Sequence, residues 1–435
     1  MQHSRLTRRQ FLERGAAAAG IAAAPLLAHG QPGNRPISAN NKILLGFVGV
    51  GGMGRSHFDR LIENPEVRLA AVCDVDARRR RAAMDFAVEH GQPAAGYNDF
   101  REMLDRHPEL DAVFVATPDH WHALATIHAI RAGKDVYCEK PLALTIGEGR
   151  KMVEAARRYN RVVQVGTMQR SDMPQFRHAC ELVRNGRIGA LERVVCFFGP
   201  NPRADYVPEE PPPNYLDWNR YLGPAPRRAY NPLIHPYNFR YFRDYSGGML
   251  TDWGVHLFDI AQWGMGADQT SPRRVEAEFT YYRDNMYEFP KQARIAYQYA
   301  GVTLEWVQGF DEEFEPGEGY GTKFYGSEGE VFVNRSGYAA RNKQGGPVNE
   351  TIGPYETHLY AAASHHQDFF DCMRTRARPI CDVAIGHRTT TISHLGNIAG
   401  WLGRPLDYDP DREVFPDHEP ANRLLFKPMR APWHV

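Results

Sequence analysis

The chain has 435 residues with 52 basic and 52 acidic side chains, so its formal net charge is zero. Hydrophobic residues make up 43% and charged residues 24%, which is the composition of a globular protein and excludes a disordered chain. A balanced charge gives no concentrated basic face, so we expect no nucleic-acid partner.

The first thirty residues differ from the rest of the chain. They hold four arginines and one acidic residue, so the remaining residues are net acidic. Arg8-Arg9 with Phe11-Leu12 precedes an alanine-rich stretch over 15–28. This pattern is typical of a twin-arginine export signal. We predict a signal peptide over 1–30, the twin-arginine machinery as a partner and a periplasmic or otherwise exported location; a basic amphipathic helix is the alternative.

Two further expectations concern the environment of the protein. The alanine-rich stretch is shorter than the roughly 20 strongly apolar residues that span a bilayer, and no later segment reaches about 18, so we expect no stable membrane span. The six cysteines show no C-x-x-C pair. A chain that folds in a reducing compartment before export needs no disulfides, and we expect none.

After a Pro/Asn/Ser-rich linker or arm over 31–42, short apolar runs alternate with helical patterns. This alternation predicts βαβ units and a parallel sheet. The expected strands are 43–50, 67–73, 112–116, 135–138 and 162–165, and the expected helices are 55–64, 77–90, 118–132 and 146–159.

The pattern changes after Gly166. A Pro/Asn/Tyr-rich stretch over 199–245 is long for a loop in a compact domain, and such loops are usually functional. Successive strand-like runs predict an antiparallel sheet. The expected strands are 193–198, 274–282, 293–299, 303–310 and 331–334, and the expected helices are 175–185, 250–263, 360–376 and 387–402.

A glycine-rich turn follows the first expected strand. It fits the G-x-G-x-x-G pattern, lies in a βαβ unit and opens a helix, where backbone N–H groups bind a pyrophosphate. The residues assigned to this turn are Gly49, Gly51, Gly52, Met53 and Gly54. A glycine turn without a ligand is the alternative. The α/β fold that we predict therefore begins with a Rossmann domain over 43–166, followed by an α+β domain over 167–435 with a large open, mainly antiparallel sheet.

Asp74 stands 25 residues after Gly49, at the end of the second expected strand. A carboxylate there accepts hydrogen bonds from ribose hydroxyls and repels a 2′-phosphate, so NAD is the expected cofactor. The arginines at 78–81 keep NADP as the alternative, because arginine near this position accommodates that phosphate.

Three further motifs accompany the glycine turn: Thr117-Pro118 with His122, Glu139-Lys140-Pro141, and Gly247-Gly248 followed by Asp252 and His256. Together, over about 43–402, they resemble the glucose–fructose oxidoreductase / inositol dehydrogenase (Gfo/Idh/MocA) family. The resemblance implies hydride exchange between a sugar or cyclitol carbon and a nicotinamide. It also implies an open sheet that serves as an oligomer interface, so we expect a homo-oligomer, either a dimer or a tetramer. Thr117, Pro118, His122, Glu139 and Lys140 are assigned to the cofactor on this basis.

The catalytic residues that we predict are Lys140, Asp252 and His256. Lys140 follows a short parallel strand, so it emerges at the carboxyl edge of the sheet, where its ammonium stabilises an oxygen that becomes a carbonyl. Asp252 and His256 are four residues apart and would share a helix face. The family resemblance implies that His256 is the general acid/base and Asp252 its partner. A surface lysine and a capping Asp/His pair are the alternatives.

Substrate-binding residues are expected in and near the aromatic-rich stretch. Sugar faces stack on aromatic rings and tyrosine hydroxyls add hydrogen bonds, although core packing explains any single ring equally well. The aromatic residues are Tyr215, Trp218, Tyr230, Tyr237, Phe239, Tyr241, Phe242 and Tyr245. We assign Tyr245 and Trp253 to the substrate, together with Arg170 after the last Rossmann strand. Neither H-E-x-x-H nor a Cys/His zinc spacing occurs in the sequence, so we expect no metal.

Export restricts the choice of function, because free NAD is not expected outside the cytoplasm. We therefore expect a tightly bound cofactor that is reset in every cycle. The predicted function is a NAD(P)-dependent oxidoreductase acting on CH–OH groups of a sugar, sugar derivative or cyclitol. One alternative is a redox-neutral NAD-dependent glycosidase that forms a transient keto-sugar. The other is a non-catalytic sugar- or cofactor-sensing binding protein.

Overall fold

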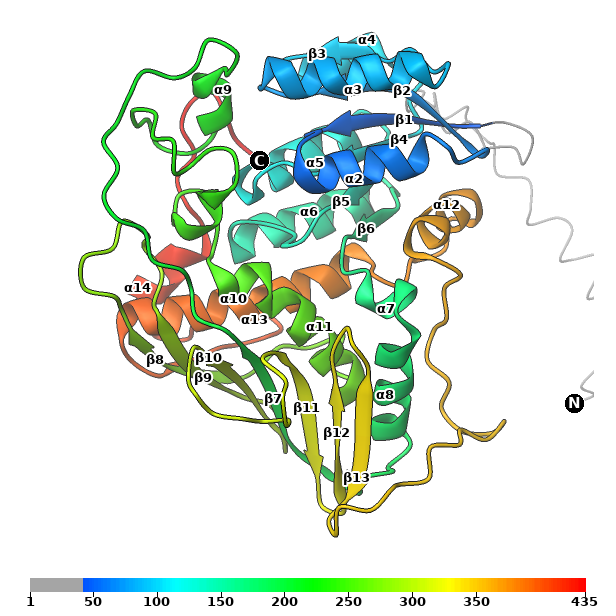
Figure 1. The fold of residues 1–435 in the computed structure, drawn as a ribbon, viewed down its shortest axis with the longest axis vertical. Helices are drawn as coiled ribbons and strands as arrows, with labels where there is room; N and C mark the ends of the chain where they lie inside the picture. Colours follow the sequence, from blue (N-terminus) through cyan, green and yellow to red (C-terminus); the bar gives the residue numbers. More distant parts are fainter. Residues whose placement is uncertain (1–41) are drawn as a thin grey trace, which may run out of the picture. The chain divides into compact units, whose positions relative to one another are not determined.

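The computed structural model describes residues 42–435, which belong to one compact unit. The predicted twin-arginine signal and nearly all of the predicted linker lie outside the described residues. Residues 42–435 form two sheets, of six and eight strands (Figure 1).

The first sheet is wholly parallel, in the order β3-β2-β1-β4-β5-β6. Its strands are β1 (Ile43–Val48), β2 (Val67–Cys73), β3 (Ala95–Tyr97), β4 (Ala112–Val115), β5 (Asp135–Cys138) and β6 (Val163–Val165). This is the strand order of a doubly wound dinucleotide-binding sheet, so the predicted Rossmann fold is confirmed. The sequence patterns did not indicate β3, because three residues are too short to show an alternation.

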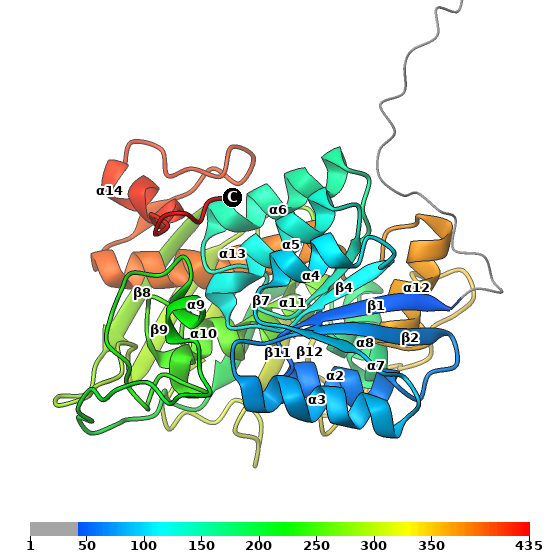
Figure 2. The same cartoon turned by 90° about the horizontal axis from the view of Figure 1, so that it is seen from above.

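Helices cover both faces of this sheet (Figure 2). They are α2 (Gly52–Leu61), α3 (Ala77–Glu89), α4 (Phe100–Arg106), η1 (Asp119–Trp121), α5 (His122–Arg131) and α6 (Ile146–Arg158). Side-chain caps mark where three of these helices begin. The side chains of Asp76, Asp99 and Thr145 accept hydrogen bonds from backbone N–H groups of α3, α4 and α6. In contrast, α2 begins at the glycine turn, and among residues 42–435 no side chain caps its first turn.

The second sheet is mixed and mostly antiparallel, in the order β13-β12-β11-β7-β10-β9-β8-β14. Its strands are β7 (Leu191–Phe198), β8 (Arg274–Thr280), β9 (Gln292–Gln298), β10 (Thr303–Gln308), β11 (Gly321–Gly326), β12 (Gly329–Val333), β13 (Tyr338–Asn342) and β14 (Leu406–Asp407). Only β7 and β10 pair in parallel within the described sheet. The expected mainly antiparallel sheet is therefore confirmed, with β11, β13 and β14 added to the expected strands.

The remaining helices are α7 (Gln169–Asp172), α8 (Pro174–Arg184), α9 (Trp218–Leu222), η2 (Asn238–Tyr241), α10 (Met249–Asp252), α11 (Gly254–Met265), α12 (His365–Thr375), α13 (Val383–Leu402), α14 (Glu419–Asn422) and η3 (Arg423–Leu425). Among them, α8, α11 and α13 cover one face of the second sheet (Figure 1). We predicted a single helix over 250–263, but the structure has two separate helices, α10 and α11, which meet at Trp253.

Helix α12 belongs to the late part of the chain but packs on the Rossmann sheet. Its Phe369 ring lies 5.9 Å from the ring of Phe114 on β4 and 6.0 Å from that of Tyr137 on β5, and all three side chains are buried. The hydrophobic core of the first sheet therefore includes residues that lie far beyond its last strand.

The long segment over 199–245 also returns to the Rossmann domain. The backbone N–H of Ala77 donates to the Tyr215 carbonyl at 2.8 Å, and the N–H of Asp217 donates to the Val75 carbonyl at 3.1 Å. These bonds hold the segment against the corner between β2 and α3. No helix within residues 42–435 combines the length and the apolar character that crossing a membrane requires.

Candidate active site

The glycine turn closes onto the end of β4. Gly49 has a φ of +88°, and a Cβ there would lie 2.6 Å from the Ala116 carbonyl oxygen. A Cβ at Gly54 would overlap the Gly49 carbonyl oxygen, and one at Gly51 would overlap the guanidinium of Arg79. The left-handed backbone of Gly49 and the close carbonyl contact at Gly54 exclude side chains at these two positions, and the uncapped first turn of α2 leaves its N–H groups for an anion. This cradle fits the pyrophosphate of a dinucleotide.

Asp74 ties the glycine turn to the end of β2. Its carboxylate accepts the N–H of Val50 at 3.0 Å and the N–H of Asp76 at 2.9 Å. Burial raises the pKa of Asp74, although both backbone donors and the nearby Arg79 favour the charged form. The remaining lone pairs of the carboxylate fit the ribose hydroxyls of a dinucleotide.

One cavity of about 320 Å³ joins the glycine turn to the end of β5. The predicted residues that line it are Gly49, Gly51, Gly52, Met53, Asp74, Thr117, Pro118, Glu139, Lys140 and Asp252. Nine of the eleven residues assigned to the cofactor therefore surround a common space. Gly54 lies beneath the turn, where it lets α2 approach the strand.

Lys140 and Asp252 form the ion pair of the cavity. The Lys140 ammonium donates to Asp252 Oδ1 at 2.5 Å and to the Asp252 main-chain carbonyl at 3.0 Å. The Arg240 Nε lies 3.3 Å from the same Oδ1. Burial opposes ionisation, but the positive charges of Lys140 and Arg240 lower the pKa of Asp252 far below its usual range. Lys140 is thus a charged hydrogen-bond donor held at a fixed point.

His256 lies one helical turn beyond Asp252, at the start of α11. The imidazole is buried, and among residues 42–435 its Nδ1 has no hydrogen-bond partner. Burial lowers the pKa of His256 well below its usual value, and the charges of Lys140 and Arg335 lower it further. His256 is therefore neutral at pH 7, which is the form that accepts a proton.

Glu139 connects the cavity to a histidine pair. Its Oε1 lies 2.8 Å from His57 Nε2 on α2, and His57 Nδ1 lies 2.8 Å from His366 Nε2 on α12. Burial disfavours the Glu139 carboxylate, but His57 and Lys140 lower its pKa. Glu139 is thus charged, with His57 on one side and Lys140 on the other.

His122 differs from the expectation that it contacts the cofactor. Its ring nitrogens lie 2.7 Å from the Pro141 carbonyl and 2.8 Å from the Thr117 carbonyl, and the side chain is buried outside the cavity lining. Burial opposes protonation, but Cys138, Asp119 and the Pro141 carbonyl raise the pKa of His122 to about 10. His122 joins the two loops that carry Thr117 and Lys140, and its assignment to the cofactor stays a prediction.

Comparison with known protein families gives two matches to this chain. Residues 43–167 match the model described as an oxidoreductase family with a NAD-binding Rossmann fold, and residues 202–435 match the C-terminal alpha/beta domain of the same oxidoreductase family. The chain belongs to the Gfo/Idh/MocA oxidoreductase family.

Several members of this family are similar to the chain. It is 29% identical to the rhizopine catabolism protein MocA of Rhizobium meliloti over 54% of the chain and 62% of that protein. It is 33% identical to the inositol 2-dehydrogenase of Salmonella typhimurium over 44% of the chain and 51% of that protein. The chain therefore spans about half to three fifths of the length of these curated relatives.

A solved structure shows the same fold. The aldose-aldose oxidoreductase from Caulobacter crescentus superposes with a TM-score of 0.62 at 22% identity, covering 84% of this chain and 100% of the other. This likeness concerns the fold and supports the Gfo/Idh/MocA architecture that the two sheets define.

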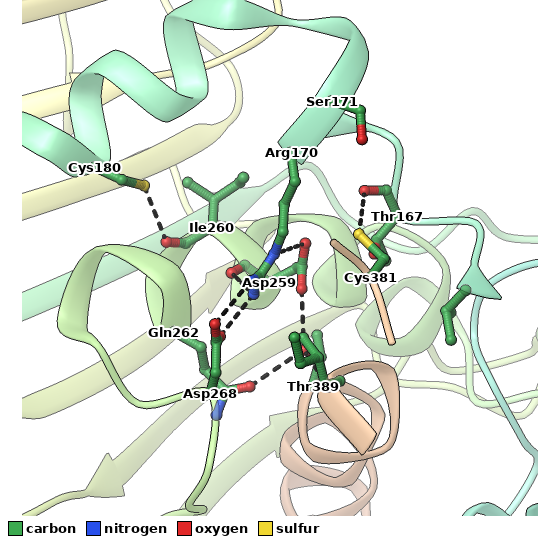
Figure 3. Close-up of polar contacts among 12 residues, drawn as sticks. Thr167, Arg170, Ser171, Cys180, Asp259, Ile260, Gln262, Asp268, Cys381 and Thr389 are labelled. Atoms are coloured by element: carbon green, nitrogen blue, oxygen red, sulfur yellow. Dashed lines mark hydrogen bonds and ion pairs between the residues drawn. The ribbon is translucent and has the colours of Figure 1, made fainter. Parts of the chain in front are cut away.

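In this Gfo/Idh/MocA chain, Arg170 does not reach the cavity. Its guanidinium bonds to Asp259 Oδ2 at 2.8 Å and to both carboxylate oxygens of Asp268 at 2.8 Å (Figure 3). Only 2% of Arg170 is exposed, and both carboxylates raise its pKa despite burial. The guanidinium thus belongs to a buried ion cluster in this structure, and the assignment of Arg170 to the substrate stays a prediction.

The two aromatic residues assigned to the substrate also lie outside the cavity lining. Tyr245 is fully buried, with its ring 5.0 Å from that of His120. Trp253 stacks on Phe198 at 4.7 Å and lies 6.0 Å from the ring of His256. Tyr245 lies in the hydrophobic core and Trp253 borders His256 from the side of the second sheet, and their assignment to the substrate stays a prediction.

Most of the aromatic stretch forms a core of its own. Trp218, Tyr230, Phe239, Tyr241, Phe242 and Tyr245 belong to one buried cluster, and Tyr237 and Phe239 line the cavity. The sequence reasoning missed Asp119 and Arg240, which also line it. Asp119 directly follows the Thr117-Pro118 motif, which could have indicated it, but Arg240 lies in a segment where the aromatic residues dominate the pattern.

No group of three or more His, Cys, Asp or Glu side chains within residues 42–435 is arranged to hold a metal ion. All six cysteines are buried and unpaired within these residues.

Proposed function

We propose that the protein is a NAD-dependent oxidoreductase that exchanges hydride between a CH–OH carbon of a sugar, sugar derivative or cyclitol and a tightly bound nicotinamide. One observation carries the proposal. The charged pair of Lys140 and Asp252 lies at the wall of the same cavity that the glycine turn and Asp74 enclose. A dinucleotide held on the glycine turn thus shares a space with a fixed ammonium donor.

The chain's residues supply charge and proton transfer. NAD, when bound, supplies the hydride acceptor. The Lys140 ammonium donates a hydrogen bond to the substrate oxygen and stabilises the negative charge that develops on it. Neutral His256 accepts the hydroxyl proton in oxidation and returns it in reduction. Asp252 keeps the ammonium oriented, because it holds Nζ through both its carboxylate and its main-chain carbonyl.

The similar proteins favour a polyhydroxylated substrate. Their names include an inositol 2-dehydrogenase and an aldose-aldose oxidoreductase. The Arg335 guanidinium lies 4.6 Å from the centroid of the Trp253 ring, beside His256, and the ring also stacks on Phe198. Arg335 therefore adds a charged hydrogen-bond donor near His256, which suits the hydroxyl groups of a sugar.

The function is tested by titrating the purified holoprotein with a panel of sugars, cyclitols and glycosides while the absorbance of reduced nicotinamide is recorded. We expect one compound to reduce the bound cofactor and a ketose or second aldose to reoxidise it. Cleavage of a glycoside without net reduction would instead establish the redox-neutral glycosidase. Binding of sugars without either reaction would establish a sensing protein.

Export and retention of the cofactor form part of the proposal. The twin-arginine pair Arg8-Arg9 supports export of a folded, cofactor-loaded chain, and the resemblance supports a dimer or tetramer built on the open second sheet. Replacing both arginines by lysine should keep the protein in the cytoplasm, which fractionation detects. Wild-type protein that also remains there would refute export. Light scattering of the holoprotein tests the oligomer, and a monomer would refute it.

A further inference from the structure

The C-terminal tail, residues 426–435, returns to the cofactor domain. Arg430 anchors it, donating to the Gly223 carbonyl at 2.9 Å and to Asn219 Oδ1 at 2.7 Å, while its own N–H donates to the Pro224 carbonyl at 2.8 Å. The tail therefore runs beside α9 and ends near α5 (Figure 1). This path brings the end of the chain to the cavity.

Trp433 is the residue of the tail that lines the cavity. Its ring meets the edge of Trp121 at 4.8 Å, and the guanidinium of Arg101 lies 4.4 Å from its centroid. Trp121 in turn meets Phe100 at 5.8 Å. Three aromatic side chains from α4, η1 and the tail thus stand together at one part of the cavity wall.

The strand order identifies this part of the cavity. Lys140 follows β5, so the nicotinamide end of a bound dinucleotide would lie beyond β4. Asp74 follows β2 and Asn98 follows β3, and both of these strands lie on the other side of β1. Phe100 begins the helix after β3 and Trp121 ends η1 after β4, so the aromatic group extends from the Asp74 side to β4 and stays away from Lys140 after β5. Asp74 fits the adenosine ribose, and the base attached to that ribose is a flat aromatic ring that stacks on aromatic side chains.

We propose that Trp433, carried on the C-terminal tail, completes the wall that binds the adenine ring and thereby slows the loss of the dinucleotide. The inference rests on the proposed NAD function and adds a binding residue from the end of the chain. Simple anchoring of the tail is the competing explanation. Arg430 already provides that anchor, and Trp433 is only partly buried with its ring at the cavity.

Calorimetric titration of the full-length apoprotein with ADP-ribose and with nicotinamide mononucleotide tests this role, since neither ligand requires turnover. Trp433→Ala should weaken ADP-ribose binding about tenfold and leave nicotinamide mononucleotide binding unchanged. The same variant should speed NADH release by a similar factor in a stopped-flow chase. Trp433→Phe should restore most of the affinity, because it keeps an aromatic face.

Trp401→Ala is the matched control, because Trp401 is a partly buried tryptophan on α13 that lies outside the cavity lining. It should bind ADP-ribose like the wild type. Wild-type affinity in Trp433→Ala, or equal weakening of both ligands, would overturn the inference. Failure of the wild-type protein to bind ADP-ribose would refute the cofactor proposal itself. Thermal unfolding without ligand shows whether each variant is folded, and Trp433→Phe provides the test if Trp433→Ala is not.

Discussion

The Lys140 ammonium lies 2.5 Å from Asp252 Oδ1, although the two residues are 112 positions apart in the chain. Lys140 follows β5 of the first sheet, and Asp252 ends α10, which packs on α11 and α13. The charged pair therefore joins the NAD-binding Rossmann domain to the C-terminal alpha/beta domain.

Lys140→Ala removes the donor that stabilises the developing charge. We expect kcat to fall by about 10² to 10³, while the Kd for NAD changes little, because the glycine turn and Asp74 remain. Steady-state kinetics measure kcat, and calorimetric titration with NAD measures the Kd. Lys151→Ala is the control, because Lys151 is a half-exposed lysine on α6 with a weak partner at 4.0 Å. Retention of turnover in Lys140→Ala would remove Lys140 from the mechanism.

The pH dependence of oxidation should reflect the lowered pKa of His256. Because an accepting base must be unprotonated, a pKa below the usual value of about 6.5 extends activity toward acid pH. We expect kcat/KM to stay near its neutral value at pH 6 rather than to halve near pH 6.5. The His256→Gln variant should lose about 10² or more in kcat. An acid limb near pH 6.5 that disappears in His256→Gln would contradict the lowered pKa.

Asp74 should determine the choice between NAD and NADP. Asp74→Ser removes the carboxylate that repels a 2′-phosphate and leaves Arg79 beside the turn. We expect the ratio of the two Kd values to shift toward NADP by about tenfold or more, which corresponds to about 1.4 kcal/mol. Fluorescence titration with both reduced cofactors measures the ratio. Asp74→Ser combined with Arg79→Ala should lose the gain, and an unchanged ratio in the single variant would assign discrimination to another residue.

Arg170 should contribute to stability and not to substrate affinity. Its removal leaves buried Asp259 without its cation, and breaking such a pair costs about 3–5 kcal/mol. We expect Arg170→Ala to lower the free energy of unfolding by an amount in this range in a urea titration. The surface pair of Arg274 and Asp407 provides the control, since Arg274→Ala should cost about 1 kcal/mol or less. If Arg170→Ala raised KM without loss of stability, the substrate assignment would be restored.

The sequence predicted the parts of the site that depend on local patterns. The glycine turn, Asp74 and Lys140 each sit at the end of an apolar strand, and parallel strands bring their carboxyl ends to one edge. The four-residue spacing of Asp252 and His256 predicted that both share one helix face. Both lie in the region of Lys140, but α10 and α11 are separate helices, and Asp252 is bound to Lys140 and Arg240.

Residues whose roles depend on distant partners were not predictable in this way. The sequence next to Arg170 does not distinguish an ion-pair residue from a substrate-binding residue, because the partners Asp259 and Asp268 lie about 90 positions later. Trp433 sits in a short segment without periodicity, and only the folded path of the tail brings it to Trp121. Pairing across such separations is a property of the tertiary structure, which no local spacing encodes.

The contact of α12 with the first sheet has a consequence for protein synthesis. Phe114 and Tyr137 leave the ribosome more than two hundred residues before Phe369, which covers them in the finished core. The nascent cofactor domain therefore exposes an aromatic face until nearly the whole chain has been made, and such faces attract chaperones. A messenger truncated before the codon for His365 would yield a polypeptide that keeps every strand of the first sheet and leaves this face open to water.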